Sequence, residues 1–188
     1  MSTTDELLRA NRHYAESRGS RLPATPTPDV AVVACMDARL DVYRILGLSE
    51  GRAHVIRNAG GVVTDDAIRS LAVSQRLLGT REVILIHHTD CGMLTFTDDE
   101  FRGSIEADTG LKPPWAAEAF GDLEGDVRQS MRRIITSPFI PHARTVRGFV
   151  FDVATGLLNE VTLADGLLQV RVLAPALLLG EEPLELGA

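Results

Sequence analysis

The 188-residue chain contains only two cysteines, Cys35 and Cys91, and His88 lies three residues before the second of them. Thiolate and imidazole side chains together are the ligands that suit zinc. Residues three apart share one face where a strand gives way to a helix, so the His88-x-x-Cys91 spacing suits chelation. Three protein ligands leave the fourth tetrahedral position open, as in catalytic zinc sites. We therefore expect one zinc ion per chain, bound by Cys35, His88 and Cys91.

Cys35 and Cys91 also admit two other interpretations. They could be buried thiols without chemistry, or they could form a disulfide, which would be unusual in a reducing compartment. A structural zinc site normally has four cysteine or histidine ligands, and this chain has no third cysteine. The residues around the two cysteines favour a catalytic metal site.

Asp37 and Arg39 follow Cys35 closely. If the chain stays extended after Cys35, residues 35, 37 and 39 point to the same side, so both charges would lie near the metal. The Arg39 fork can hold a carboxylate through two hydrogen bonds and keep it ionised. Asp37 would then accept a hydrogen bond from a zinc-bound hydroxide and orient it. The alternative is a surface ion pair, which contributes less than ~1 kcal/mol.

Gly60 and Gly61 form a second cluster, directly before a predicted helix at residues 64–78. Paired glycines let the backbone approach a ligand closely, and helix N-termini favour anions. Gly60 and Gly61 are therefore candidates for binding a ligand such as the substrate, and a tight turn would explain the same residues equally well.

The remaining aromatic candidates are not expected to act on the metal. Successive side chains of a strand point to opposite faces, so His87 should point away from His88. Trp115 is expected in the core or at an interface rather than as a stacking platform.

Short apolar runs predict the strands of a sheet. The order strand, helix, strand, helix, strand over the first half of the chain implies right-handed crossovers and a largely parallel sheet. Two later strands flank Ala154-Thr155-Gly156 and predict a hairpin. The predicted strands cover residues 30–34, 53–56, 82–87, 146–153 and 158–163, and the predicted helices cover 4–18, 41–46, 64–78 and about 123–134.

The candidate residues all leave the carboxyl ends of these strands, where sites gather in open parallel sheets. Cys35 follows the first strand, Asn58 and the glycines follow the second, and His88 follows the third. We therefore expect them to meet at one edge of the sheet.

Composition limits the classes of protein and the domain organisation. The net charge of −7 argues against nucleic-acid binding, which usually needs a basic face. No apolar run approaches the ~20 residues of a membrane helix, and residues 1–16 lack the apolar centre of a signal peptide. We therefore expect a cytoplasmic protein without membrane or nucleic-acid partners. Residues 1–28 are interpreted as a helical arm and linker, 29–172 as a zinc-binding α/β domain and 173–188 as a tail of unknown role.

Three segments resemble the β-class carbonic anhydrases, in the order of that family. They are Cys35-Met36-Asp37-Ala38-Arg39, His54-Val55-Ile56-Arg57-Asn58-Ala59-Gly60-Gly61 and His87-His88-Thr89-Asp90-Cys91-Gly92, and the similarity extends over roughly residues 7–172. The resemblance implies an α/β fold with a mostly parallel central sheet, an antiparallel edge strand and flanking helices. It is greatest to the compact bacterial members.

The resemblance also implies a site and an activity. The zinc ligands would be Cys35, His88 and Cys91, and the Asp/Arg dyad would be Asp37 and Arg39, with Asp37 able to swing onto the metal. The expected reaction is reversible hydration of CO2 to bicarbonate and a proton. Members are homodimers or dimers of dimers, with sites at the interface and N-terminal helices wrapped over the partner.

Two alternatives to CO2 hydration remain. Some relatives of this family hydrolyse carbonyl sulfide or carbon disulfide, which are linear like CO2 and open to the same attack. A non-catalytic zinc-binding homologue would retain the metal without the reaction, but such a protein has no use for Asp37 and Arg39.

Overall fold

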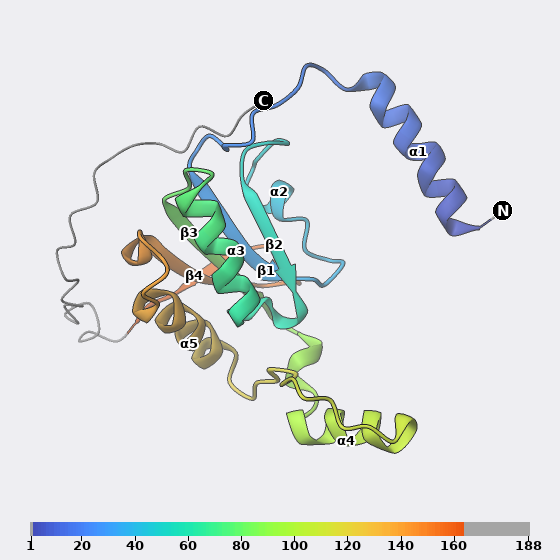
Figure 1. Cartoon of the computed structure of the whole chain (residues 1–188), viewed down its shortest axis with the longest axis vertical. Coiled ribbons are helices and arrows are strands. Elements are labelled where there is room, and N and C mark those ends of the chain that lie inside the picture. The colour runs from blue at the N-terminus through green and yellow to red at the C-terminus, as the bar shows by residue number, and fades with distance from the viewer. Residues whose placement is uncertain (1, 164–188) are drawn as a thin grey trace.

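The computed structural model describes residues 2–163 of the chain. A five-stranded sheet forms the centre of this described part, in the order β2-β1-β3-β4-β5 (Figure 1). The strands are β1 (Val30–Cys35), β2 (His54–Asn58), β3 (Glu82–His88), β4 (Val146–Phe151) and β5 (Leu158–Val161). The first four pair in parallel, and β5 pairs with β4 antiparallel. The predicted fold class, a mostly parallel sheet with an antiparallel edge strand, is confirmed.

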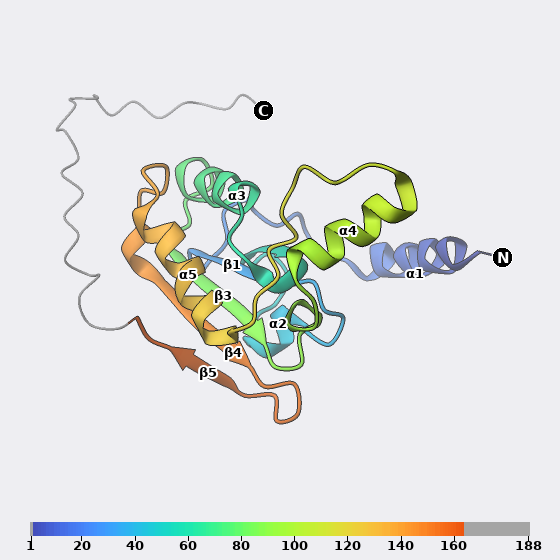
Figure 2. The ribbon, with the colours of Figure 1, turned by 90° about the horizontal axis from the view of Figure 1, so that it is seen from below.

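Helices α3 (Asp65–Arg76) and α5 (Leu123–Thr136) cover one face of the sheet (Figures 1 and 2). Their apolar side chains are spaced at helical intervals, so Leu71, Val127 and Ile134 are fully buried against alternate residues of β1 and β3. The opposite face packs on the short helix α2 (Val42–Ile45) and on loops. The described chain therefore has a three-layer arrangement in which the second outer layer is thin.

The chain changes direction within the sheet between β1 and β3. From β1 it crosses to β2 on one side, and from β2 it returns through α3 to β3 on the other side of β1. Ligand sites of open α/β sheets lie at such a switch point, beyond the carboxyl ends of the two strands. Those two ends are Cys35 and His88.

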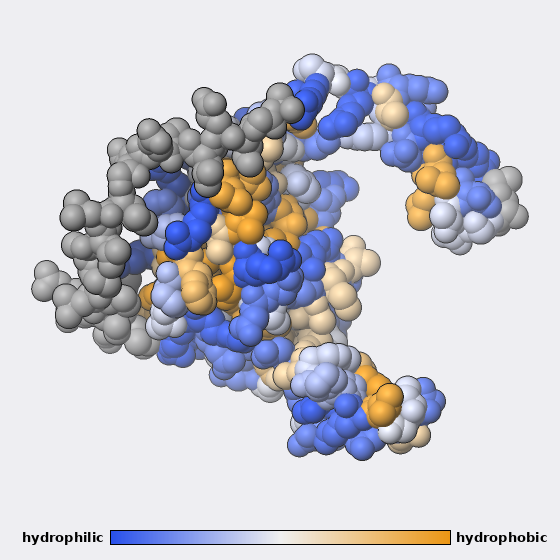
Figure 3. All heavy atoms as spheres, in the orientation of Figure 1, coloured by the Kyte–Doolittle hydropathy of each residue, from blue (hydrophilic) through white to orange (hydrophobic). Residues whose placement is uncertain are grey.

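Two segments stand away from the body of the chain (Figures 1 and 2). One is helix α1 (Thr3–Ser17), which has no buried residue, and the other includes helix α4 (Asp98–Thr109), which has none either. Apolar residues are visible on both segments in Figure 3. No helix within residues 2–163 combines the length and the apolar character needed to cross a membrane.

The structure differs from the sequence predictions at two helix starts. The cap of α1 is Ser2 with Asp5, so the helix begins at Thr3, one residue before the predicted start at residue 4. Helix α4 is absent from the sequence predictions, although Thr97 and Glu100 form a capping box at its start. Its apolar residues are few and none is buried, so hydrophobic spacing gives no signal.

Three short 3-10 turns lie in the connections between the longer elements. They cover Ala59–Gly61, Gly92–Leu94 and Ala143–Thr145, and the first two come directly after β2 and close after β3. The tail predicted at residues 173–188 lies outside the described residues, as does the last part of the domain predicted at 29–172.

Candidate metal centre

Cys35, His88 and Cys91 come together at the carboxyl ends of β1 and β3. The two strands pair in parallel with Ala34 opposite Ile86, which brings their ends side by side. Cys91 follows three residues after His88, as the cap of the 3-10 turn Gly92–Leu94. The three donor atoms all lie within 4.8 Å of one another, and all three residues are buried. Thiolate and imidazole ligands lie about 2.0–2.3 Å from zinc, so small shifts allow the three atoms to share one ion.

The chemistry of the donors fits zinc. His88 Nδ1 lies 2.9 Å from the Thr89 carbonyl oxygen, so this nitrogen carries the proton and the lone pair is left on Nε2. Nε2 is buried and finds no hydrogen-bond partner among the residues that the structure describes. A buried acceptor without a partner is costly unless an ion or a donor satisfies it. The histidine is thus already oriented as a metal ligand.

The two thiols are free and share one environment. A hydrogen bond from Cys91 lowers the pKa of Cys35, with further help from His88 and from the backbone amides of Asp37 and Gly60. The same contact with Cys35 raises the pKa of Cys91. A thiolate is therefore stabilised in this cluster, and the thiolate is the form of cysteine that binds metals.

His87 points away from the cluster, as its place on β3 predicts. Its Nε2 lies 2.7 Å from Asp126 Oδ2 on α5, on the opposite face of the sheet. His87 is fully buried, and its ring lies near that of Phe120. It therefore links β3 to α5 and does not reach the metal centre.

Asp37 and Arg39 form a pair through two hydrogen bonds beside the three donors. Arg39 Nε lies 2.9 Å from Asp37 Oδ1, and Arg39 Nη2 lies 2.8 Å from Asp37 Oδ2. These hydrogen bonds lower the pKa of Asp37 below its ordinary value of 3.8. Asp37 Oδ2 is also 3.8 Å from His88 Nε2. The carboxylate is therefore ionised and held within reach of the ligand atoms.

The reason for this pairing differs from the one expected. The sequence prediction assumes an extended chain after Cys35, but Leu40 N donates to the Asp37 carbonyl oxygen and closes a turn. Arg39 N also donates to Asp37 Oδ1 at 2.9 Å. The turn, rather than strand alternation, puts the two charges on the same side.

Two further charged residues hold this segment, and neither is among the predicted site residues. Asp90 Oδ2 accepts a hydrogen bond from Arg39 Nη1 at 2.6 Å. Arg57 donates to the carbonyl oxygens of Cys35 at 3.0 Å and of Asp37 at 2.6 Å. Arg57 lies near the end of β2, and Asp90 lies just before Cys91. Both residues are inside the segments that resemble the β-class carbonic anhydrases, and their place in those segments is the sequence signal that could have identified them.

Gly60 and Gly61 both adopt a positive φ, of 80° and 75°. A Cβ on Gly61 would lie 2.7 Å from the backbone nitrogen of Cys35, so this glycine lets the turn pack tightly against β1. Gly60 lines a cavity beside the metal centre. The two glycines therefore differ in their surroundings, and only Gly60 is in contact with the cavity.

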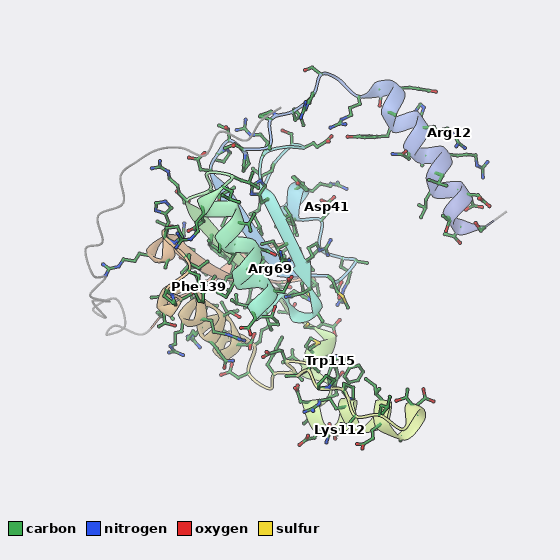
Figure 4. The ribbon with its side chains drawn as sticks, in the orientation of Figure 1. Arg12, Asp41, Arg69, Lys112, Trp115 and Phe139 are labelled. Carbon is green, nitrogen blue, oxygen red and sulfur yellow. The ribbon has the colours of Figure 1, made fainter. Side chains whose placement is uncertain are left out.

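The cavity has a volume of about 700 Å³ and opens to the surface. Cys35, Asp37 and Cys91 lie at its inner end, and its walls are mainly apolar, with Met93, Phe96, Phe101 and Trp115 among them. Trp115 is 52% exposed in the single chain, so of the two places expected for it the core is excluded, and a place at an interface stays a prediction. Figure 4 labels it on the segment beside α4, where its ring lies 6.3 Å from that of Phe101. A small apolar molecule can reach Cys35, Cys91 and Asp37 through this cavity.

Several known proteins are similar to this chain in sequence and in fold. The family described as "Carbonic anhydrase" matches residues 30–158. The "Beta-carbonic anhydrase 1" of Mycobacterium tuberculosis (strain ATCC 25618 / H37Rv) is 63% identical over 162 residues, covering 86% of this chain and 99% of the relative. The "Carbon disulfide hydrolase" of Acidianus sp. (strain A1-3) is 48% identical over 180 residues, covering 83% and 87%.

Among solved structures, the carbonic anhydrase from Streptococcus mutans superposes with a TM-score of 0.81. It is 43% identical, and the match covers 86% of this chain and 99% of that one. The matched family segment includes both strands that carry the metal centre. From the sequence match, the shared fold and the Cys/His/Cys cluster together, the chain belongs to the β-carbonic anhydrase family.

Proposed function

We propose that the chain catalyses the reversible hydration of CO2 to bicarbonate and a proton, with one zinc ion held by Cys35, His88 and Cys91. The observation that carries the proposal is the buried cluster of three donors at the switch point, one of them an unpartnered imidazole nitrogen within the described residues. The identity of 63% to a β-carbonic anhydrase supports the same reaction.

The ion would supply a nucleophile at neutral pH, because zinc lowers the pKa of a bound water from about 15.7 to about 7. Asp37 is held ionised by Arg39, so it is a hydrogen-bond acceptor throughout this range. A carboxylate at 3.8 Å from His88 Nε2 is placed to accept a hydrogen bond from the attacking group and to orient its lone pair. Arg39 in turn keeps Asp37 from taking up that proton.

The cavity would admit and desolvate the substrate. CO2 is small and has no net charge, so apolar walls around Met93 and Phe96 bind it without loss of hydrogen bonds. Gly60 lines the cavity, and we propose that its backbone, with that of the neighbouring Gly61, helps position substrate or product.

Carbon disulfide or carbonyl sulfide hydrolysis is the second candidate. Two observations favour it: the Acidianus relative is described as a carbon disulfide hydrolase, and the cavity of about 700 Å³ has mainly apolar walls, which suit an apolar substrate. The higher identity to the carbonic anhydrase makes CO2 the first choice.

Purified protein with measured zinc content tests these candidates. The CO2 hydration rate should rise with pH and scale with zinc content across preparations. A rate on carbonyl sulfide or carbon disulfide far above that on CO2 would favour the second candidate. Zinc-loaded protein without activity on any of the three would leave a non-catalytic homologue and overturn the proposal.

We also propose that the active form is a homodimer or a dimer of dimers. Helix α1 exposes Leu7 and Leu8, at 65% and 52%, and none of its residues is buried against the rest of residues 2–163. Its attachment is slight: Tyr14 and Arg18 contact Glu50. A helix of this kind gains stability only when a partner covers its apolar side. We accordingly interpret residues 1–28 as an arm and 29–172 as the catalytic domain.

The proposed location is the cytoplasm. Both ligand cysteines are free thiols, and a reducing compartment keeps such a pair from oxidising to a disulfide.

A further inference from the structure

Asp90 occupies a backbone conformation that residues other than glycine rarely adopt. Its φ is +56°, in the left-handed region where asparagine and aspartate are the tolerated residues. It lies between His88 and Cys91, immediately after β3. This conformation turns both its carboxylate and its carbonyl oxygen toward Arg39.

Arg39 is held from two sides. On one side its Nε and Nη2 donate to the two carboxylate oxygens of Asp37. On the other side its Nη1 donates to Asp90 Oδ2 at 2.6 Å, and its Nη2 donates to the Asp90 carbonyl oxygen at 2.9 Å. An arginine side chain that is 44% exposed would otherwise sample many rotamers. The two carboxylates come from separate loops, with Asp90 51 residues from Arg39 in sequence, and they fix the plane of the guanidinium.

Because Arg39 is hydrogen-bonded to Asp37, fixing the position of Arg39 also fixes that of Asp37. Asp37 Oδ2 lies 3.8 Å from His88 Nε2, so a small rotation would bring this oxygen to an ion bound there. Arg39 opposes the rotation only as long as its own position is fixed. Without Asp90, Arg39 could swing away from Asp37, and Asp37 would then be free to rotate toward the metal centre.

We propose that Asp90 is a positioning residue that anchors Arg39 and thereby keeps Asp37 off the metal and oriented toward the reacting group. The proposal rests on the proposed zinc-dependent hydration of CO2. It assigns to Asp90 a specific task that its 79% exposed side chain would not otherwise suggest.

An ordinary surface ion pair in the same chain provides the contrast. Asp66 and Arg69 on α3 are 2.7 Å apart, with exposures of 71% and 69%, and they lie three residues apart in sequence. Such pairs contribute little. The pair of Asp90 and Arg39 differs in two ways. It joins the segment after Cys35 to the segment before Cys91, and Asp90 adopts a left-handed backbone conformation to make it.

Two substitutions of Asp90 separate the effect of its negative charge from the effect of its side-chain volume. Asp90→Asn keeps the shape and tolerates the positive φ, and Asp90→Gly removes the side chain without backbone strain. In zinc-loaded protein we expect kcat/KM for CO2 to fall about 10-fold in Asp90→Asn and further in Asp90→Gly. Zinc content and melting temperature should stay near those of the parent, and Asp66→Asn should leave all three quantities unchanged.

A double-mutant cycle and a crystal structure supply the decisive readouts. In the Arg39→Ala background, Asp90→Asn should have no further effect on kcat/KM, because its action runs through Arg39. The crystal structure of zinc-loaded Asp90→Asn should show Asp37 rotated from Arg39 onto the metal. In the parent protein at the same pH, Asp37 should remain on Arg39.

Unchanged kcat/KM, or Asp37 found on Arg39 in both crystals, would overturn the proposal. So would a loss of activity that only follows a loss of zinc, because Asp90 would then have a structural role alone. If the zinc-loaded parent does not hydrate CO2, the proposed function fails, but the orientation of Asp37 in the two crystals still tests the anchor.

Discussion

At the scale of single residues, the centre is a set of buried donors surrounded by groups that orient them. The Thr89 carbonyl oxygen directs the free nitrogen of His88 inward, and a hydrogen bond from Cys91, helped by backbone amides, lowers the pKa of Cys35. Such outer contacts tune a metal site as much as its ligands do. Removing a ligand and removing an orienting group should therefore have different consequences.

Replacing a ligand should remove the ion. Serine is a poor zinc ligand because its hydroxyl does not ionise near neutral pH, so Cys35→Ser should retain less than about one tenth of an equivalent of zinc. CO2 hydration should be lost with the metal. Metal analysis and a stopped-flow assay on the same sample test this, and a full equivalent of zinc in the variant would refute the ligand assignment.

Replacing Asp37 should leave the ion in place. Asp37→Asn keeps the shape but removes the ionised acceptor, so zinc content should be unchanged while kcat/KM falls about 100-fold. Asp41→Asn is the matched control. Asp41 lies four residues after Asp37 and caps the N-terminus of α2, and asparagine caps a helix equally well. Parent-like activity in Asp37→Asn would remove the proposed role of the dyad.

The lowered pKa of Asp37 excludes this carboxylate as the group whose titration controls activity near neutral pH. Since Arg39 depresses this pKa below 3.8, the carboxylate is ionised above that pH and is protonated only in stronger acid. Activity that rises between about pH 6 and 9 must then report another group, the metal-bound water of pKa about 7. Asp37→Asn, whose amide does not titrate, should lower the rate but leave the inflection of the profile in the same place; a profile shifted by more than about one unit would contradict this assignment.

At the scale of elements, close contact between β4 and α5 supports the strands that carry the site. A Cβ on Gly148 would lie 2.4 Å from Val127 Cγ1 and 3.1 Å from Met131 Sδ, so this glycine allows α5 to approach the sheet. The same helix supplies Asp126, which pairs with His87 next to the proposed ligand His88. The position of β3 therefore depends on how closely α5 packs.

Gly148→Ala should disturb that packing. The added methyl group forces α5 outward and should destabilise the protein by about 1–3 kcal/mol in urea unfolding. Gly103→Ala on α4 is the control, since no atom lies within 4 Å of a Cβ there and alanine favours a helix. Equal stability in the two variants would show that the close approach at Gly148 is unimportant.

At the scale of the whole molecule, the described chain leaves apolar surface uncovered on α1 and near α4 (Figure 3). Phe101 and Trp115, which line the cavity, belong to the second of these segments. Association of two chains would therefore affect the surroundings of the site as well as stability.

Substitution on α1 should weaken association. Leu7→Glu with Leu8→Glu should shift the protein toward the monomer in light scattering and lower its melting temperature, which should otherwise rise with protein concentration. Leu157→Glu, at a side chain 63% exposed in the β4–β5 connection, is the control. A double variant that associates like the parent would exclude α1 from the interface.

The sequence by itself determined the sheet, its mostly parallel pairing, the edge hairpin and the residues expected at the metal centre. These depend on local patterns, because buried parallel strands are continuous apolar runs and their ends carry the reactive side chains. The positions of Cys35, Asp37, His88 and Cys91 were predictable for this reason. Helix α4 was not, because hydrophobic spacing cannot reveal a helix with no buried face.

Only the tertiary structure decided which residues hold the reactive ones. Asp90 and Arg57 act across strands that are distant in sequence, and no spacing rule relates them to Arg39 or to the carbonyl oxygens of residues 35 and 37. The turn that pairs Asp37 with Arg39 and the tight packing of Gly61 on β1 likewise depend on backbone geometry. Residue types set the chemistry that is available, whereas the meeting of separate loops sets the orientation of each charge.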